Sequence, residues 1–200
     1  MRQDHAFHHG EAVSQRIIGR WLSTLFDAVI TVDPHLHRIA DLSEVLPAKH
    51  IVTLNAGPLL AAFLHQRLGR ALLIGPDSES QQWVEQIAER AGMDYLVGEK
   101  QRLSDTEVHI KLPLGNLRGK TAVIVDDVAS TARTLAITAQ HLRAAGAAEI
   151  HCCVTHALFV GDAEAVLRKA GINHIWSTDS VLHSSNAVEL AGILAAAVTG

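Results

Sequence analysis

The chain has 200 residues, which is enough for one substantial domain or for one domain and part of a second. Hydrophobic residues make up 48% and charged residues 19%, which excludes a disordered or fibrous protein. Aromatic residues make up only 4%, so aliphatic side chains must supply the core. The formal net charge of -4 and the lack of a basic tract predict no nucleic-acid partner and no attraction to an anionic membrane.

The apolar stretches, the cysteines and the histidines further limit the class of protein. The longest apolar stretch, roughly 188–198, is too short to span a bilayer, and the chain starts with a polar segment unlike a signal peptide, so we expect a cytoplasmic protein. Cys152 and Cys153 are adjacent, so on a strand they would point to opposite faces and remain buried thiols. The 13 histidines are scattered, and no HExxH or CxxC pattern gathers them into a metal site.

The hydrophobic pattern predicts helices and strands that alternate along the chain. The expected helices are 13–26, with Ser14 as a cap, then 58–68, 79–91, 131–145, 163–170 and 187–198. The expected strands are 28–33, 51–55, 71–75, 95–98, 106–112 (or a hairpin arm), 121–127, 149–159 and 174–179. This alternation predicts an α/β fold with a parallel sheet and helices on both faces, in three layers.

Ligands of such sheets bind at the carboxyl ends of the strands, so the loops after residues 32, 74, 97, 125 and 155 should be considered together. The segment 121–135 is the most informative of them, because it runs from a buried strand into Asp126 and Asp127 and then into a helix start. A helix amino terminus with hydroxyl groups suits a phosphate, and two carboxylates suit the hydroxyls of a neighbouring ribose. The alternative is that Asp127 and Ser130 are helix caps and Asp126 is a solvated turn residue.

This segment resembles the diphosphoribosyl-binding signature of the phosphoribosyltransferase fold, which is Rossmann-like. The resemblance implies that the ribose 5-phosphate site consists of Asp126, Asp127, Ser130, Thr131, Ala132, Arg133 and Thr134. Ala132 and Arg133 stand where small residues are usual. Arg133 is a departure that either adds a phosphate contact through its planar guanidinium or opens the loop through its bulk.

Four further segments resemble those of the ribose-phosphate diphosphokinase family, in the same order along the chain. They are a nucleotide-contacting segment (Arg2, Gln3, Asp4), a cation segment with His35 in the histidine position, a diphosphate loop (Asp77, Ser78, Glu79, Ser80) and a catalytic Lys-x-Arg (Lys100, Arg102). The diphosphate loop departs from the usual pattern, because Ser78, Glu79 and Ser80 stand where glycines are common. Lys100 and Arg102 lie on a predicted polar loop between Gly98 and Thr106, which alone would read as a solvated surface loop.

The resemblance implies transfer of diphosphate from ATP to ribose 5-phosphate, with Lys100 and Arg102 closing over the phosphates. It implies Mg²⁺ held by His35 and Asp77, with Asp126 or Asp127 near a second cation and His37 as a bystander. ATP would contact Arg2, Gln3, Asp4 and His35. Family members form dimers and hexamers, which implies a homo-oligomer here, with the apolar faces of the predicted helices 13–26 and 187–198 as candidate contacts.

Family members are roughly half as long again and contain two similar domains. The resemblance therefore implies that residues 1–33 are the remnant of an N-terminal phosphoribosyltransferase-like domain and that residues 34–200 form the domain that binds ribose 5-phosphate. The activity of such a shortened chain is left open. Two alternatives are a non-catalytic regulator of the same family and a type I phosphoribosyltransferase of nucleotide salvage, in which residues 1–30 would cover the base.

Overall fold

The computed structural model describes residues 3, 5–6, 8–36, 39–102, 108–111 and 116–199, with the backbone alone for 100–102 and 108–111. Within it the chain forms two compact units, Ala56–Leu190 and a smaller unit of Met1–Asn55 with Ala191–Gly200. None of the described helices is long and apolar enough to cross a membrane.

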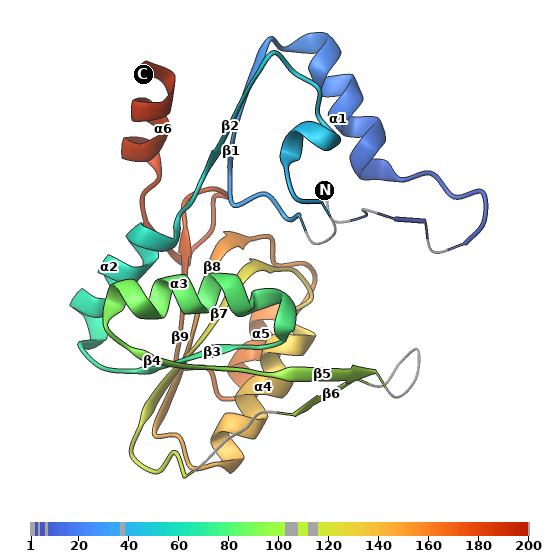
Figure 1. Ribbon diagram of the computed structural model, residues 1–200. Coiled ribbons are helices and arrows are strands. Elements are labelled where there is room, and N and C mark those ends of the chain that lie inside the picture. The colour runs from blue at the N-terminus through green and yellow to red at the C-terminus, as the bar shows by residue number, and fades with distance from the viewer. Residues whose placement is uncertain are drawn as a thin grey trace. The chain divides into compact units, whose positions relative to one another are not determined.

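The larger unit is built on a six-stranded sheet with the order β10-β9-β8-β7-β3-β4, in which every neighbouring pair is parallel (Figure 1). Its strands are β3 (Leu72–Gly75), β4 (Asp94–Val97), β7 (Thr121–Ala129), β8 (Glu149–Ala157), β9 (His174–Thr178) and β10 (Asn186–Val188). Its helices are α2 (Gly57–Leu68), α3 (Gln81–Ala91), α4 (Arg133–Ala144) and α5 (Ala163–Lys169), with a short 3₁₀ turn η2 (Ser78–Ser80). The predicted parallel α/β fold is confirmed.

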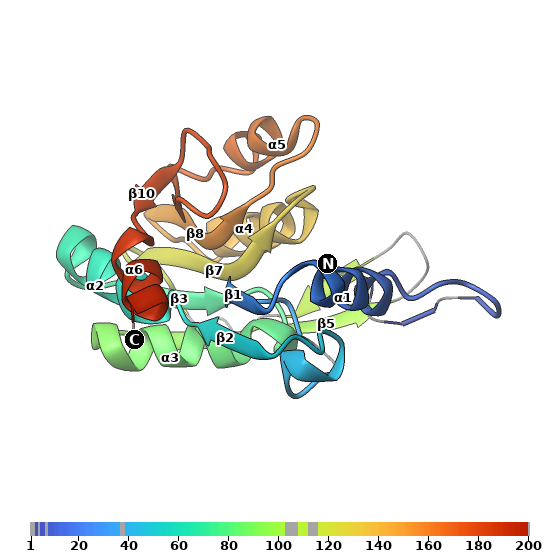
Figure 2. The same cartoon turned by 90° about the horizontal axis from the view of Figure 1, so that it is seen from above.

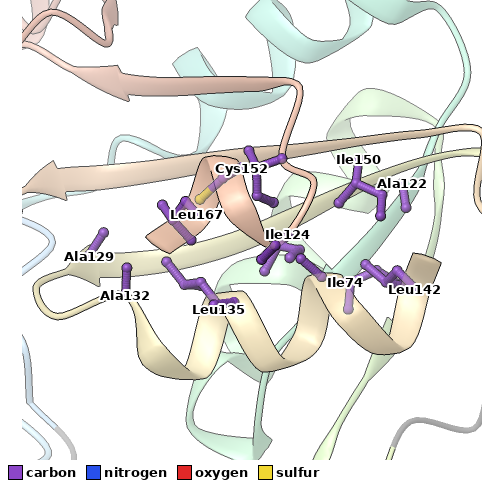
Figure 3. Close-up of a cluster of buried hydrophobic side chains, with 14 of the residues drawn as sticks. Ile74, Ala122, Ile124, Ala129, Ala132, Leu135, Leu142, Ile150, Cys152 and Leu167 are labelled. Atoms are coloured by element: carbon purple, nitrogen blue, oxygen red, sulfur yellow. The ribbon is translucent and has the colours of Figure 1, made fainter. Parts of the chain in front are cut away.

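Helices cover both faces of this sheet, as Figure 2 shows, with α2 and α3 on one side and α4 and α5 on the other. The strands are therefore apolar on both faces, which is typical of parallel sheets. On the α4 side, Ile124, Leu135, Cys152 and Leu167 join one buried cluster (Figure 3). Cys153, on the next position of β8, is also buried and lies outside this cluster, and both cysteines are free, as the alternation along a strand predicts.

The smaller unit contains a two-stranded parallel sheet of β1 (Ala28–Val32) and β2 (His50–Leu54) with the helices α1 (Ser14–Leu25) and α6 (Ala191–Thr199). A 3₁₀ turn, η1 (Leu42–Glu44), contributes to its small core, which consists of Ile39, Leu42, Val45 and Leu46. Gly19 of α1 is essential to this packing, because a Cβ there would lie 2.0 Å from the carbonyl oxygen of Val45.

The boundary between the units differs from the one expected after residue 33. Residues 34–55 belong to the smaller unit because β2 pairs with β1 along its whole length. The end of the chain, Ala191–Gly200, also joins the smaller unit, and its helix α6 lies beside β2.

Two predicted elements were wrong in detail. The helix expected at 187–198 is an edge strand, β10, followed by the shorter α6, because the side-chain amide of Asn186 donates to the carbonyl oxygens of Thr178 (2.6 Å) and Val181 (3.0 Å) and holds the chain beside β9. The loop expected between Gly98 and Thr106 begins as a strand, β5 (Glu99–Arg102), which pairs antiparallel with β6 (Val108–Lys111).

Candidate functional site

The end of β7 carries the two carboxylates that the sequence singled out. Asp127 is 3% exposed and Asp126 is half-buried. The backbone N–H of Asp127 donates to Oδ1 of Asp126 over 3.0 Å, which holds the Asp126 side chain against its own strand. The simple alternative of Asp126 as a solvated turn residue therefore does not describe the structure, since the strand continues two residues beyond Asp127.

The diphosphate loop follows β3, the neighbour of β7 in the sheet. Ile74 of β3 is paired with Ile124 of β7. Asp77 and Asp127 each lie three residues further along their chain segments, so both reach the same edge of the sheet. Asp77 is 8% exposed, and its Oδ1 accepts the backbone N–H of Glu79 (3.1 Å).

Ser80 differs from the other residues of this loop because its side chain forms a hydrogen bond inside the loop. Its hydroxyl donates to the backbone oxygen of Asp77 over 2.6 Å, and the side chain is 1% exposed. Gly75 makes room for it, since a Cβ there would lie 2.6 Å from the Ser80 Oγ. Ser78 and Glu79 are the exposed members of the predicted diphosphate loop.

The electrostatics of this edge are dominated by negative charge. Burial raises the pKa of Asp126 well above its usual value, and the nearby carboxylates of Asp127 and Asp77 raise it further, while the backbone N–H of Asp127 opposes them. The carboxylates of Asp127 and Asp77 are thus close enough to Asp126 to disfavour its ionisation. A cation or a hydrogen-bond donor placed among them would relieve that repulsion.

The turn between β7 and α4 has a backbone suited to a bound anion. Ala132 has a left-handed conformation (φ 58°, ψ 11°), and α4 begins at Arg133, two residues later than predicted. Ala132, the N-cap residue of α4, has no side-chain group that could cap the helix, and the N–H groups of a first helical turn have no acceptor within the helix. These groups and the helix dipole favour an anion there.

The side chains of the turn before α4 differ in how exposed they are. Thr131 and Arg133 are exposed, Ser130 and Thr134 are half-buried, and Ala132 is buried within the core cluster. The backbone N–H of Val160 donates to the carbonyl oxygen of Ser130 over 3.2 Å and fixes the turn to the segment after β8.

The carboxylates at this edge could hold a divalent cation only together with ligands from water and substrate. Among the described residues there is no group of three or more His, Cys, Asp or Glu side chains arranged to hold a metal ion. Mg²⁺ usually binds one or two carboxylates and takes its other ligands from water and substrate phosphates. Asp77, Asp126 and Asp127 fit that kind of site, in which the substrate completes the coordination.

The other predicted site residues lie in different parts of the chain. Lys100 and Arg102 are in β5, where their backbones pair with Ile110 and Val108, instead of on a loop. Gln3 and His35 belong to the smaller unit. Arg2, Asp4 and His37 lie outside the described residues.

One network beside the strand ends was not predicted. His183 contacts Oε1 of Glu164 through Nε2 (3.0 Å) and Oγ of Ser185 through Nδ1 (2.8 Å), which fastens the loop between β9 and β10 to α5. Scattered Ser, His and Glu residues give no signal of such a network in the sequence, because their spacing along the chain follows no recognisable motif.

Comparison with known proteins agrees with the geometry. Residues 49–193 match the family described as "Phosphoribosyl transferase domain". The chain is 36% identical over 199 residues to the ribose-phosphate pyrophosphokinase of Methanopyrus kandleri, a match that covers 98% of this chain and 67% of that protein. It is 32% identical to ribose-phosphate pyrophosphokinase 2 of Archaeoglobus fulgidus, covering 97% of this chain and 69% of that protein.

A solved structure shows the same fold. The phosphoribosylpyrophosphate synthetase of Mycobacterium smegmatis superimposes with a TM-score of 0.80 and 21% identity, over 99% of this chain and 66% of that one. This chain thus spans about two thirds of the length of these relatives.

The parallel sheet, the carboxylate pair at the end of β7 and the family match define a protein of the phosphoribosyltransferase type. Within that class, the chain belongs to the ribose-phosphate pyrophosphokinase family, which is also called the phosphoribosylpyrophosphate synthetase family.

Proposed function

We propose that the chain acts as a ribose-phosphate diphosphokinase, transferring a diphosphoryl group from ATP to ribose 5-phosphate. The anomeric oxygen of the sugar forms a bond to the β-phosphorus of ATP, the bond from that phosphorus to the α,β-bridging oxygen breaks, and AMP leaves while the hydroxyl proton passes to solvent. The observation that supports this most directly is the end of β7, where two carboxylates precede the turn into α4.

In this proposal the sugar phosphate is bound at the turn from β7 to α4. Asp126 and Asp127 accept hydrogen bonds from the 2- and 3-hydroxyls of the ribose. The hydroxyls of Ser130, Thr131 and Thr134 and the backbone at Ala132 and Arg133 surround the 5-phosphate. The left-handed backbone of Ala132 directs the chain into α4 so that the first-turn N–H groups face the anion.

The diphosphate would lie between this turn and the loop after β3. Asp77 and one carboxylate of β7 would hold Mg²⁺, which neutralises the phosphate charge that accumulates during transfer. Ser78 and Glu79 are the exposed members of that loop, and Glu79 approaches the phosphates only through the cation or turns away from them. Lys100 and Arg102 of β5 would supply positive charge, and Arg2, Gln3, Asp4 and His35 would form the ATP site, with His35 as a further cation ligand.

The smaller unit fits the proposal that residues 1–33 derive from a second, similar domain. Its β1–β2 pair is parallel, like the large sheet, and α1 and α6 accompany it. A parallel pair of only two strands is unusual, because parallel sheets are normally wider and covered on both faces.

The test is calorimetric titration with ribose 5-phosphate and then with ATP, each with Mg²⁺, followed by a coupled measurement of AMP release. We expect both ligands to bind and AMP to form. Lys100→Ala should lower AMP formation at least 100-fold and leave the affinity for ribose 5-phosphate unchanged, because a charge that acts on the transition state lowers turnover more than sugar binding. Equal losses in turnover and sugar affinity would contradict a catalytic role for Lys100.

A non-catalytic regulator is a second candidate, which the exposed Arg133 and Glu79 in the two ligand loops favour. It predicts binding of phosphoribosyl ligands without AMP formation. A salvage phosphoribosyltransferase predicts instead that a nucleobase and 5-phosphoribosyl 1-diphosphate protect the protein together against thermal unfolding.

A further inference from the structure

The first turn of α1 contains a buried carboxamide, that of Gln15, which is 6% exposed. Its Nε2 donates to the backbone oxygen of His35 over 3.4 Å, and its Oε1 has no hydrogen-bond partner in the described structure. Burying an incompletely paired amide destabilises a folded protein. An apolar residue would pack into the same position without that cost, so the amide of Gln15 is not explained by the stability of α1.

The same turn of α1 also fixes Gln3. The backbone N–H of Gln15 donates to the carbonyl oxygen of Gln3 over 3.1 Å. The side-chain oxygen of Gln3 accepts both the backbone N–H (3.3 Å) and the hydroxyl of Ser14, while its Nε2 donates to the carbonyl oxygen of Ala12 (2.9 Å). Val13, at the N-cap position, has no side-chain acceptor, so Gln3 caps α1 from a distant part of the sequence.

Contacts on both sides of His35 hold the segment that carries it. The backbone N–H of Asp33 donates to the carbonyl oxygen of Leu54 (2.9 Å), and Leu36 packs against the small core of this unit. Between them, Gln15 holds the carbonyl oxygen of His35. Gln15 is thus bonded to both segments that the sequence associates with ATP, through its backbone to Gln3 and through its side chain to His35.

We propose that Gln15 is a positioning residue for ATP, which acts by fixing His35 relative to the segment around Gln3. This inference rests on the proposed function, because that proposal is what assigns the two segments to ATP. The carboxamide of Gln3 is occupied by α1, so Gln3 contributes by holding its segment in place. Without the donor at Gln15, the carbonyl oxygen of His35 loses this hydrogen bond and the loop can move. This weakens ATP binding and leaves the binding of ribose 5-phosphate unaffected.

The test uses two variants and a control from the same helix. Gln15→Leu removes both polar atoms, and Gln15→Glu keeps the shape but replaces the donor with a second oxygen. Thr24→Ala is the control, because the Thr24 hydroxyl donates to the Trp21 carbonyl oxygen (2.7 Å) near the far end of α1. Each folded protein is titrated with ATP and with ribose 5-phosphate in the presence of Mg²⁺, and its thermal midpoint is recorded.

We expect both Gln15 variants to bind ATP about tenfold more weakly than the control, with the affinity for ribose 5-phosphate unchanged. If Gln15→Glu binds ATP like the control, the donor is not needed and the inference is wrong. Equal losses for both ligands would show a general effect on folding and would also overturn it. If the unaltered chain binds ribose 5-phosphate but not ATP, the ATP part of the proposed function fails together with this inference, and binding of neither ligand refutes the proposed site on β7 as well.

Discussion

Asp126 lies where its own ionisation is opposed by its surroundings. Burial raises its pKa, and the charges of Asp127 and Asp77 add to the effect. In the unfolded chain the pKa of Asp126 is near its usual value of 3.8, whereas in the folded chain it is higher. The folded state is therefore destabilised as the pH rises above 3.8, and this destabilisation persists at neutral pH. Binding sites commonly retain such destabilising charges for function.

Asp126→Asn should therefore stabilise the protein and weaken ribose 5-phosphate binding. We expect the free energy of unfolding at pH 7 to rise by about 1–2 kcal/mol, because a neutral amide removes the repulsion and can still accept the N–H of Asp127. The difference from wild type should shrink as the pH is lowered toward 4. Denaturant unfolding measures it, with Asp94→Asn at the exposed start of β4 as control. Lower stability of Asp126→Asn at pH 7 would contradict the electrostatic account.

Ala132 supplies a second prediction, because its left-handed backbone favours glycine. Ala132→Gly should gain about 1 kcal/mol from relief of the positive φ and lose about 0.8 kcal/mol from the buried methyl group, for almost no net change. Ala136→Gly lies in the same helix with ordinary helical geometry and should cost about 2 kcal/mol. Equal costs for the two substitutions, measured by denaturant unfolding, would show that Ala132 carries no backbone strain.

The strand β8 buries the ring of His151 within electrostatic range of Arg67 in α2. The ring is 2% exposed, its Nδ1 has no partner in the described structure, and it stacks on His174 (5.3 Å between ring centroids). Burial lowers the pKa of His151, the nearby Arg67 and His174 also lower it, and Glu149, with Oε2 3.4 Å from Nε2, raises it in part. The neutral ring is therefore the form that the fold accommodates.

This arrangement predicts that stability falls as the pH drops below about 6.5, where His151 in the unfolded chain takes up a proton more readily than in the folded chain. The contribution of one such group is at most about 1.4 kcal/mol per pH unit. His151→Leu should make the free energy of unfolding less dependent on pH between 6.5 and 5. His141→Gln on α4 serves as the comparison, and an unchanged slope in His151→Leu would contradict the role of this ring.

The order and type of most elements could be predicted from the sequence, because buried parallel strands and their covering helices produce strong hydrophobic patterns. The start of α4 could not, since Ala132 gives no sign in sequence that it adopts a positive φ. Pairing partners also escaped prediction. The strand β5 is polar and owes its extended form to β6, and β2 joins β1 in a separate sheet, which only tertiary contacts decide.

The sequence predicted the carboxylates of the candidate site but not the side-chain contacts around it, because only the carboxylates are linked to the strand pattern. Asp126 and Asp127 lie near the end of the apolar strand β7, Asp77 follows β3, and the three meet at one sheet edge, as the topology requires. The capping role of Ser80 within its own loop and the contacts of Gln3 and Gln15 depend on side-chain geometry that no local pattern encodes.

At the scale of the whole molecule, α1 exposes an apolar face. Ile17, Trp21 and Leu25 are each more than half exposed at a spacing of four residues, and the adjoining Phe26 is 54% exposed. The spacing is self-complementary, since two antiparallel copies centred on Trp21 would place Ile17 of one against Leu25 of the other. Large apolar faces of this kind commonly mark subunit contacts.

We therefore expect the chain to form a homo-oligomer through α1. Trp21→Glu should shift the protein to monomer in analytical ultracentrifugation, because a charge at the centre of an apolar contact is costly to bury. Leu182→Glu, which changes a 96% exposed loop residue of the larger unit, should leave the assembly unchanged. A monomeric wild type, or an oligomer that Trp21→Glu does not affect, would contradict this contact.

Calorimetric titration with ribose 5-phosphate in the presence of Mg²⁺ tests whether the turn from β7 to α4 binds this sugar phosphate. We expect saturable binding with one site per chain, and a loss of affinity of about tenfold or more in Asp127→Asn. The absence of binding to the folded wild-type chain, or equal affinity in Asp127→Asn, would contradict it.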